Sequence, residues 1–143
     1  LYTMNILFLC VGNSARSQIA EGLAKEILTE EFNIKSAGSK PSGFIHSGAI
    51  KTMNNIGIDI SNQSSKGFKD LDDEFLDNLD YIITLCSEDS CPVTKNNVNK
   101  TRWSIPDPAS VKLSKSHEEK IFNNTRDDIY NLIKSFVIKE KLI

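Results

Sequence analysis

The segment 10–17 combines the residue types in this chain that are most able to do chemistry. Five residues separate Cys10 from Arg16, and Gly12 and Asn13 lie between them. Glycine and asparagine tolerate positive φ angles, which can turn successive backbone N–H groups towards one point. An arginine offers a planar fork that suits two oxygens of an oxyanion. The segment therefore predicts a cradle for a tetrahedral oxyanion such as phosphate, sulfate or arsenate.

We expect the cradle to lie directly before a helix, whose N-terminal N–H groups and partial positive charge also favour an anion. The same field favours the thiolate form of Cys10, and a thiolate beneath a bound oxyanion is a nucleophile in position to attack. The Ser17 hydroxyl is placed to donate to that sulfur. The alternative is that Cys10 only ends a buried strand as a small hydrophobic residue. The expected anion-binding residues are Val11, Gly12, Asn13, Ser14, Ala15, Arg16 and Ser17.

The chain has two further cysteines, Cys86 and Cys91, with four residues between them. An odd, low count of cysteines gives no disulfide framework, so we expect a cytoplasmic protein in which thiols persist. Two alternatives without redox chemistry stay open. In the first, the two cysteines are incidental. In the second, they bind zinc together with His46, although their spacing is not the tight Cys-x2-Cys pattern and a fourth ligand is missing.

Asp107 stands between Pro106 and Pro108. Two prolines restrict the backbone and hold the carboxylate in a fixed direction. A protonated carboxyl group held near the oxyanion could protonate a leaving oxygen. The local sequence by itself favours the simpler interpretation, which is an ordinary turn, since aspartate is common in turns.

Hydrophobic periodicity predicts the elements that position these residues. The segments 4–10 and 81–86 are short, apolar and followed by polar loops, which is typical of strands buried on both faces. Helices are predicted at 17–32, 47–56 and 70–79, and shorter strands at 33–37 and 101–105. A last helix carries an apolar stripe that ends at Phe136, and the spacing of Ser116 and Glu119 predicts a capping box at its start.

This order of elements predicts one α/β domain over residues 1–143, with a mostly parallel four-stranded sheet flanked by helices on both faces. Ligands of such sheets bind beyond the carboxyl ends of the strands, where both Cys10 and Cys86 lie. The formal net charge of −2 and the pI of about 5.7 argue against non-specific nucleic-acid binding. The longest unbroken apolar run, 6–11, is far shorter than the roughly 20 residues of a membrane helix, and we expect neither a membrane partner nor a signal peptide.

The sequence CVGNSARSQ, which follows ILFL, resembles the phosphate-binding loop of the low-molecular-weight protein tyrosine phosphatase fold. More closely, it resembles the thioredoxin-coupled arsenate reductases built on that fold. The family fold is a four-stranded parallel sheet flanked by helices, which agrees with the order of elements. The similarity covers nearly the whole chain, through the segments 36–38, 49–50, 57–61, 65–66, 84–86, 91–92 and 103–108.

The resemblance implies a reaction and assigns roles to the residues named above. Cys10 would attack the arsenic of arsenate while Asp107 helps to expel an oxygen. Cys86 would then attack Cys10 and release arsenite, and Cys91 would move the disulfide to Cys86–Cys91 by ordinary thiol exchange. A thioredoxin, or a similar thiol carrier, would reduce that pair. Phosphate and sulfate would compete with arsenate for the cradle, and a monomer is expected.

The resemblance also implies a potassium site, because Asn13, Glu21 and Ser36 match positions that hold this ion in some of the reductases. Two other functions stay open. One is a low-molecular-weight phosphatase that acts through a cysteinyl-phosphate, although those enzymes usually carry adjacent tyrosines after the Asp-Pro pair and here Tyr130 stands alone. The other is an oxyanion-binding or thiol-sensing module without turnover.

Overall fold

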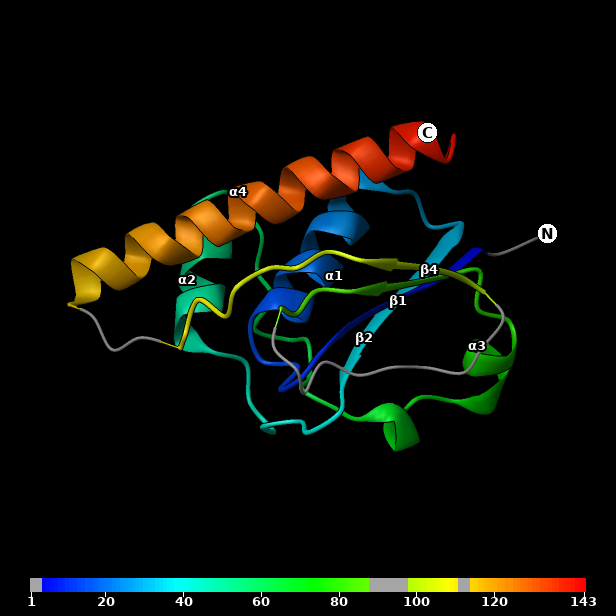
Figure 1. Cartoon of the computed structure of the whole chain (residues 1–143), viewed down its shortest axis with the longest axis horizontal. Helices are drawn as coiled ribbons and strands as arrows, with labels where there is room; N and C mark the ends of the chain where they lie inside the picture. The colour runs from blue at the N-terminus through cyan, green and yellow to red at the C-terminus, as the bar shows by residue number, and fades with distance from the viewer. Residues whose placement is uncertain (1–3, 88–97, 111–113) are drawn as a thin grey trace.

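The computed structural model describes residues 4–87, 98–110 and 114–143 (Figure 1). Its strands form one sheet in the order β2-β1-β3-β4, and every neighbouring pair is parallel. The predicted four-stranded parallel sheet is therefore confirmed. The strands are β1 (Met4–Cys10), β2 (Phe32–Gly38), β3 (Tyr81–Thr84) and β4 (Asn99–Arg102).

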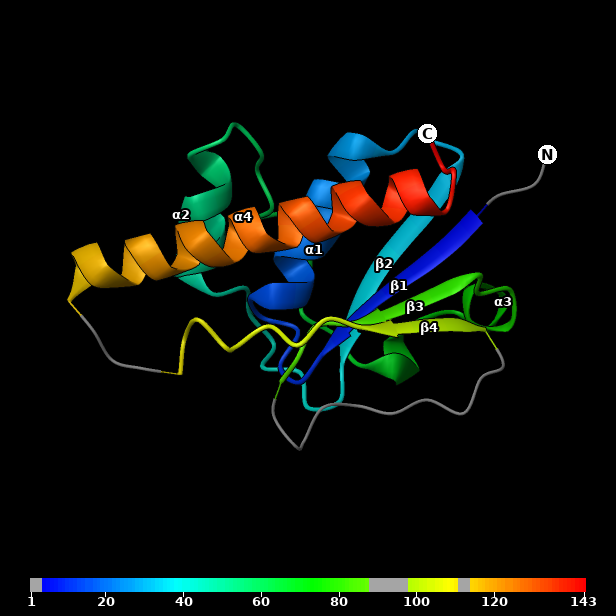
Figure 2. The ribbon, with the colours of Figure 1, turned by 45° about the horizontal axis from the view of Figure 1, so that its top comes forward.

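Helices cover both faces of this sheet (Figure 2). The helices α1 (Arg16–Ile27), α2 (Ser47–Asn54) and α4 (Lys115–Lys139) lie over one face, and α3 (Asp73–Asp77) and the short η1 (Phe68–Asp70) lie on the other. Alternate residues of a strand point to opposite faces, which explains why β1 is apolar at every position from Ile6 to Cys10. Ile6 and Phe8 pack in the core with α1 and α4, whereas Leu7 and Leu9 pack with Phe75 of α3.

The two central strands were the easiest to predict, and the outer strand β4 was not. The observed β1 matches the predicted 4–10, and β3 ends at Thr84, two residues earlier than expected. The strand β4 occupies 99–102 instead of 101–105, because the chain bends where Ile105 N–H donates to the Trp103 carbonyl. The apolar residues after this bend fill the core and are not part of the sheet.

Several helix ends also differ from the prediction. The helix α2 ends at Asn54 and not at Ile56, and α3 covers only Asp73–Asp77 of the predicted 70–79. The helix α1 ends at Ile27 and not near 32, because Leu28 is already extended with φ −97° and ψ 159°. The helix α4 begins at Lys115, and its N-cap residue is Ser114. The capping box expected at Ser116 and Glu119 is therefore wrong. No helix within the described residues combines the length and the hydropathy that a membrane span requires.

Candidate oxyanion-binding site

Cys10 is the last residue of β1, and the loop after it enters α1 at Arg16 at the carboxyl end of the sheet. Gly38, which ends β2, lies directly against this loop. A Cβ atom at position 38 would collide with the Val11 carbonyl oxygen and would lie 2.9 Å from the Asn13 nitrogen. The close approach of β2 to the loop therefore requires a glycine.

The carbonyl groups of the loop are bound from one side by the segment that follows β2. Backbone N–H groups donate to them from Ser39 to Cys10, from Lys40 to Val11, from Ser42 to Gly12 and from His46 to Ser14, with N···O distances of 3.3, 2.9, 3.0 and 2.9 Å. Each peptide is trans, so the N–H group that follows a carbonyl points the opposite way. The N–H groups of Val11, Gly12 and Ala15 therefore face away from that segment. They lie on the side available to an anion.

The sulfur of Cys10 lies on this same side of the loop. Asn13 N–H donates to Cys10 Sγ over 3.2 Å, and Ser17 Oγ lies 2.8 Å from it. Asn13 Nδ2 donates to Ser17 Oγ over 2.7 Å, so the hydroxyl keeps its proton for the sulfur. Asn13 has φ 46°, the left-handed conformation that asparagine tolerates. Cys10 is only 2% exposed and carries a free thiol.

Arg16 joins the loop to the segment that contains Asp107. Its side chain is buried, and Nη1 donates to the Ile105 carbonyl over 2.9 Å. Asp107 follows two residues later and is half-buried. Its Oδ1 accepts from Ala109 N–H over 2.9 Å, which makes the tight turn that the local sequence favoured. The structure therefore shows the ordinary turn. It also shows that the bond from Arg16 holds Ile105 close to the loop 10–16, which we call the anion loop.

Cys86 lies beyond the end of β3, which neighbours the Cys10 strand. Leu85 N–H donates to the Leu9 carbonyl over 2.8 Å, and Cys86 is fully buried. Arg102 Nε donates to the Cys86 carbonyl over 3.1 Å. Cys86 is disulfide-bonded. Cys91 lies outside the described residues.

The contacts of His46 do not support the zinc alternative. Its Nδ1 accepts from Gly48 N–H over 2.9 Å at the start of α2, and its ring stacks on Phe122 with centroids 4.9 Å apart. In the parts of the chain that the structure describes, no three His, Cys, Asp or Glu side chains gather to hold a metal ion.

Lys66 contacts two of the residues that were expected to hold potassium, Glu21 and Asn13. Ser36 O–H donates to Glu21 Oε1 over 2.6 Å, and the Lys66 ammonium lies 3.9 Å from the same oxygen. The other oxygen of Glu21 pairs with Lys25 at 2.7 Å. Burial lowers the pKa of Lys66, and the nearby Glu21 carboxylate opposes that shift. Asn13 Oδ1 accepts from Lys66 N–H, so protein groups already satisfy these oxygens and the set as it lies here does not fit a potassium ion.

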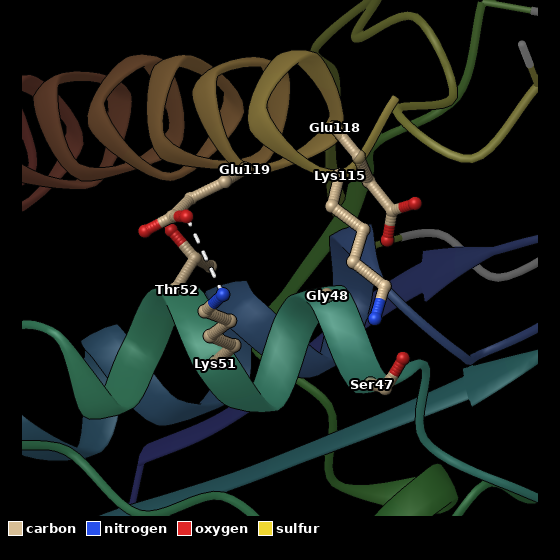
Figure 3. A pocket seen from close by; sticks show the side chains of 7 residues that line it. All are labelled: Ser47, Gly48, Lys51, Thr52, Lys115, Glu118 and Glu119. Atoms are coloured by element: carbon tan, nitrogen blue, oxygen red, sulfur yellow. Dashed lines mark ion pairs between the residues drawn. The ribbon is translucent and has the colours of Figure 1, made fainter. Parts of the chain in front are cut away.

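A separate pocket lies between α2 and the first turn of α4 (Figure 3). Its volume is about 340 Å³, and it is lined by two lysines, two glutamates and three small residues from the two helices. Lys51 and Glu119 form an ion pair of 3.3 Å across it. Because the charges of the two signs balance, the pocket offers no excess charge that would select an anion.

The sequence did not indicate that Gln18, Gln63 and Lys66 support the loop. Gln18 and Lys66 bond to Asn13, and Gln63 bonds to Gln18. Gln18 is fully buried in α1 and donates to Asn13 Oδ1 over 2.9 Å. The available signal was weak: a glutamine stands on the helix directly beside the apolar Ile19. The contacts of Gln63 and Lys66 with this region join residues more than 40 positions apart, which no local pattern reveals.

A buried thiol that ends a central parallel strand, followed by N–H groups on one side and an arginine at the first helical residue, defines a cysteine-dependent oxyanion-binding protein of the phosphatase type. The chain belongs to the family described as low molecular weight phosphotyrosine protein phosphatase, whose model matches residues 5–142.

Within this family, the proteins similar to this chain include several arsenate reductases, as the sequence resemblance implied. The chain is 41% identical over 133 residues to the arsenate reductase of Bacillus subtilis (strain 168), which covers 92% of this chain and 93% of that one. A solved arsenate reductase in the oxidized state superposes with a TM-score of 0.77 at 26% identity and covers 96% of this chain and 98% of that chain. A thioredoxin-dependent arsenate reductase from Corynebacterium glutamicum superposes with a TM-score of 0.68 at 27% identity and covers 96% of this chain and 63% of that chain.

Proposed function

We propose that this protein reduces arsenate to arsenite with Cys10 as the nucleophile. The observation that carries the proposal is the position of the Cys10 sulfur, which accepts from Asn13 N–H and lies beside the Ser17 hydroxyl on the N–H side of the loop. In that place the sulfur faces the side on which the N–H groups would bind an anion. The arsenate reductases among the relatives support the choice of substrate.

In the first step, the loop N–H groups and Arg16 bind the arsenate oxygens. Cys10 Sγ forms a bond to arsenic, and one As–O bond breaks. The departing oxygen leaves as water after it takes a proton, which we assign to Asp107. The bond from Arg16 to the Ile105 carbonyl supports this assignment, because it brings the Asp107 segment to the same loop.

In the second step, the thiolate of Cys86 attacks Cys10 Sγ. The S–As bond breaks and its electron pair stays on arsenic, so arsenic is reduced by two electrons and two thiols are oxidised to the Cys10–Cys86 disulfide. The burial of Cys86 beyond the strand that neighbours β1 supports this pairing. Cys91 then attacks Cys86, which frees Cys10 and leaves a Cys86–Cys91 disulfide.

A dithiol carrier, which we propose to be thioredoxin, reduces that disulfide and is itself oxidised. The thioredoxin-dependent relative supports the choice of carrier. The test is arsenate-dependent oxidation of NADPH in the presence of thioredoxin and thioredoxin reductase. We expect turnover by the wild type and none by Cys10→Ser. A folded, reduced wild type that oxidises no NADPH would contradict the proposal.

The relay makes a sharper prediction about Cys91. We expect Cys91→Ser to release about one arsenite per protein molecule and then stop, because the Cys10–Cys86 disulfide can no longer be passed on. Mass-spectrometric mapping should find that disulfide after a single addition of arsenate. If Cys91→Ser turns over like the wild type, the assigned relay is wrong even if the reductase activity stands.

A phosphatase activity is the second candidate, because the family and the anion loop are shared by both reactions. Phosphate transfer needs Cys10, Arg16 and an acid, but neither Cys86 nor Cys91. An aryl phosphate substrate therefore separates the two functions. If Cys86→Ser retains aryl phosphate hydrolysis at the wild-type rate and the wild type reduces no arsenate, the phosphatase is the function.

A further inference from the structure

Behind the anion loop, a row of side-chain amides leads from the segment 63–66 to the Cys10 sulfur. Gln63 Nε2 donates to Gln18 Oε1 over 2.8 Å, and Gln18 Nε2 donates to Asn13 Oδ1 over 2.9 Å. Asn13 Nδ2 donates to Ser17 Oγ over 2.7 Å, and Ser17 Oγ lies 2.8 Å from Cys10 Sγ. Every donor in this row points the same way, towards the sulfur.

The orientation of the Asn13 amide is fixed by two donors from outside the loop. Its Oδ1 accepts from Gln18 Nε2 and also from Lys66 N–H, each over 2.9 Å. A rotated amide would place Nδ2 against both donors and would turn Oδ1 towards Ser17. The hydroxyl would then donate to Asn13 and would no longer donate to the sulfur.

Gln18 is the residue that holds this arrangement from inside the helix. It is fully buried, and its Nε2 also donates to the Ser64 carbonyl over 2.9 Å and to the Asn13 carbonyl over 3.1 Å. These carbonyl oxygens cannot donate, so they fix which end of the Gln18 amide faces Asn13. A buried amide is costly unless its groups are bonded, and here the bonds go to Asn13 and to the segment that backs it.

We propose that Gln18 is a positioning residue for the nucleophile: its amide fixes the Asn13 side chain, which directs the Ser17 hydroxyl at Cys10 Sγ. The inference rests on the proposed function only in taking Cys10 as the nucleophile. Its test uses no arsenate, so it can fail while the reductase assignment stands, and the reverse is also true.

The first experiment measures the rate at which iodoacetamide alkylates Cys10 in the reduced full chain, at a fixed pH below the ordinary thiol value of about 8.5. The readout is the modified fraction of the peptide that carries Cys10. Gln18→Met keeps the length of the side chain and removes its donors. We expect the rate to fall about tenfold, because a hydrogen bond to a charged group is lost or misdirected.

A double-mutant cycle separates positioning from general loosening. Ser17→Ala removes the hydroxyl that Gln18 is proposed to direct, so Gln18→Met should slow alkylation by less than about twofold in that background. An unchanged rate in the single variant Gln18→Met would overturn the inference. The same fall in the presence and absence of the Ser17 hydroxyl would also overturn it, because Gln18 would then act by another route.

A second pair of variants tests the same bonds from the half-buried end of the row, where the core is not disturbed. Gln63→Glu replaces the donor to Gln18 Oε1 by a carboxylate, which attracts Gln18 Nε2 and turns that amide over. The exposed Asn62→Asp adds the same charge one position away and serves as the control. We expect alkylation to slow several-fold in Gln63→Glu and to change little in Asn62→Asp. Equal effects would mean that charge alone is responsible and would overturn the inference.

Discussion

The two halves of the candidate site are held in different ways. The anion loop is fixed by bonds from distant segments: Lys40 N–H reaches the Val11 carbonyl, and Lys66 N–H reaches Asn13 Oδ1. Asp107 is held by its own turn, in which the partners Ala109 and Ser110 are two and three residues away. The bond from Arg16 Nη1 to the Ile105 carbonyl joins the two halves.

This contrast suggests which properties depend on the whole fold and which on a local turn. Binding a tetrahedral anion requires several N–H groups to keep one geometry, and long-range bonds provide that. Proton transfer requires a single carboxyl group at one place. A change in the acid should therefore affect the chemistry alone, whereas a change in the loop should affect binding and stability together.

The largest effect is expected from Asp107→Asn. We expect the rate of arsenite release in a single turnover to fall by about 10²-fold or more, because the acid is lost. The asparagine Oδ1 can still accept from Ala109 N–H, so phosphate affinity and melting temperature should stay at wild-type values. Asp59→Asn is the matched control, since Asp59 Oδ1 accepts from Ser61 N–H in the same kind of turn. Equal rates for the two variants would remove Asp107 from the mechanism.

Arg16→Lys would weaken the bond that joins the two halves. A lysine keeps the charge but loses the planar fork that binds two oxygens and reaches Ile105. We expect phosphate to bind about tenfold more weakly by calorimetry, and arsenite release to slow by more than the loss of binding explains. If binding and release fell by the same factor, Arg16 would serve the anion alone, and the link to the Asp107 segment would have no catalytic role.

Gly38→Ala would disturb the half that depends on distant segments. The new Cβ would collide with the backbone of Val11 and Asn13, and such overpacking typically costs about 1–3 kcal/mol of unfolding free energy. We expect a lower melting temperature and weaker phosphate binding. Gly67→Ala is the control, because its Cβ would meet Pro41 Cγ at an ordinary 3.5 Å. If both variants melt alike, the close approach at position 38 is not what shapes the loop.

The smallest effect concerns the cation near Glu21. We propose that the Lys66 ammonium takes the place where potassium was expected, so exchanging sodium for potassium should leave the wild-type melting temperature unchanged. Lys66→Met removes that ammonium while the backbone bond to Asn13 can remain. In this variant we expect potassium to raise the melting temperature relative to sodium. Stabilisation of the wild type by potassium would contradict the proposal.

The sequence predicted the parts of the fold and site that have local signals. The apolar strand β1 and the positive φ of Asn13 were expected from neighbouring residues and are observed, whereas Gly12 does not take the positive φ that its residue type allowed. The strand β4 consists of exposed residues, with the partly buried Val98 before it and the buried Trp103 after it. No periodic pattern marks such an edge strand, so the apolar residues after it were assigned in its place.

The support behind the loop could not be predicted in the same way. Gln18 is adjacent to the loop, but its role depends on the Ser64 carbonyl, 46 residues later. The role of Lys66 likewise depends on its contacts with Glu21 of α1 and with Asn13 of the loop. Such roles arise from tertiary contacts, and a single sequence records only the residue types.

The trans peptides of the loop, with their carbonyl groups bound to the segment 39–46, also explain how a protein of net charge −2 can attract an anion. If the loop binds an anion as proposed, the attraction would come from peptide dipoles that the surrounding backbone prevents from reorienting, together with the buried Arg16 guanidinium group. The proposed preference for negative ligands would then depend on the direction of the main chain, so changes in the acidic side chains elsewhere on the surface should not reverse it.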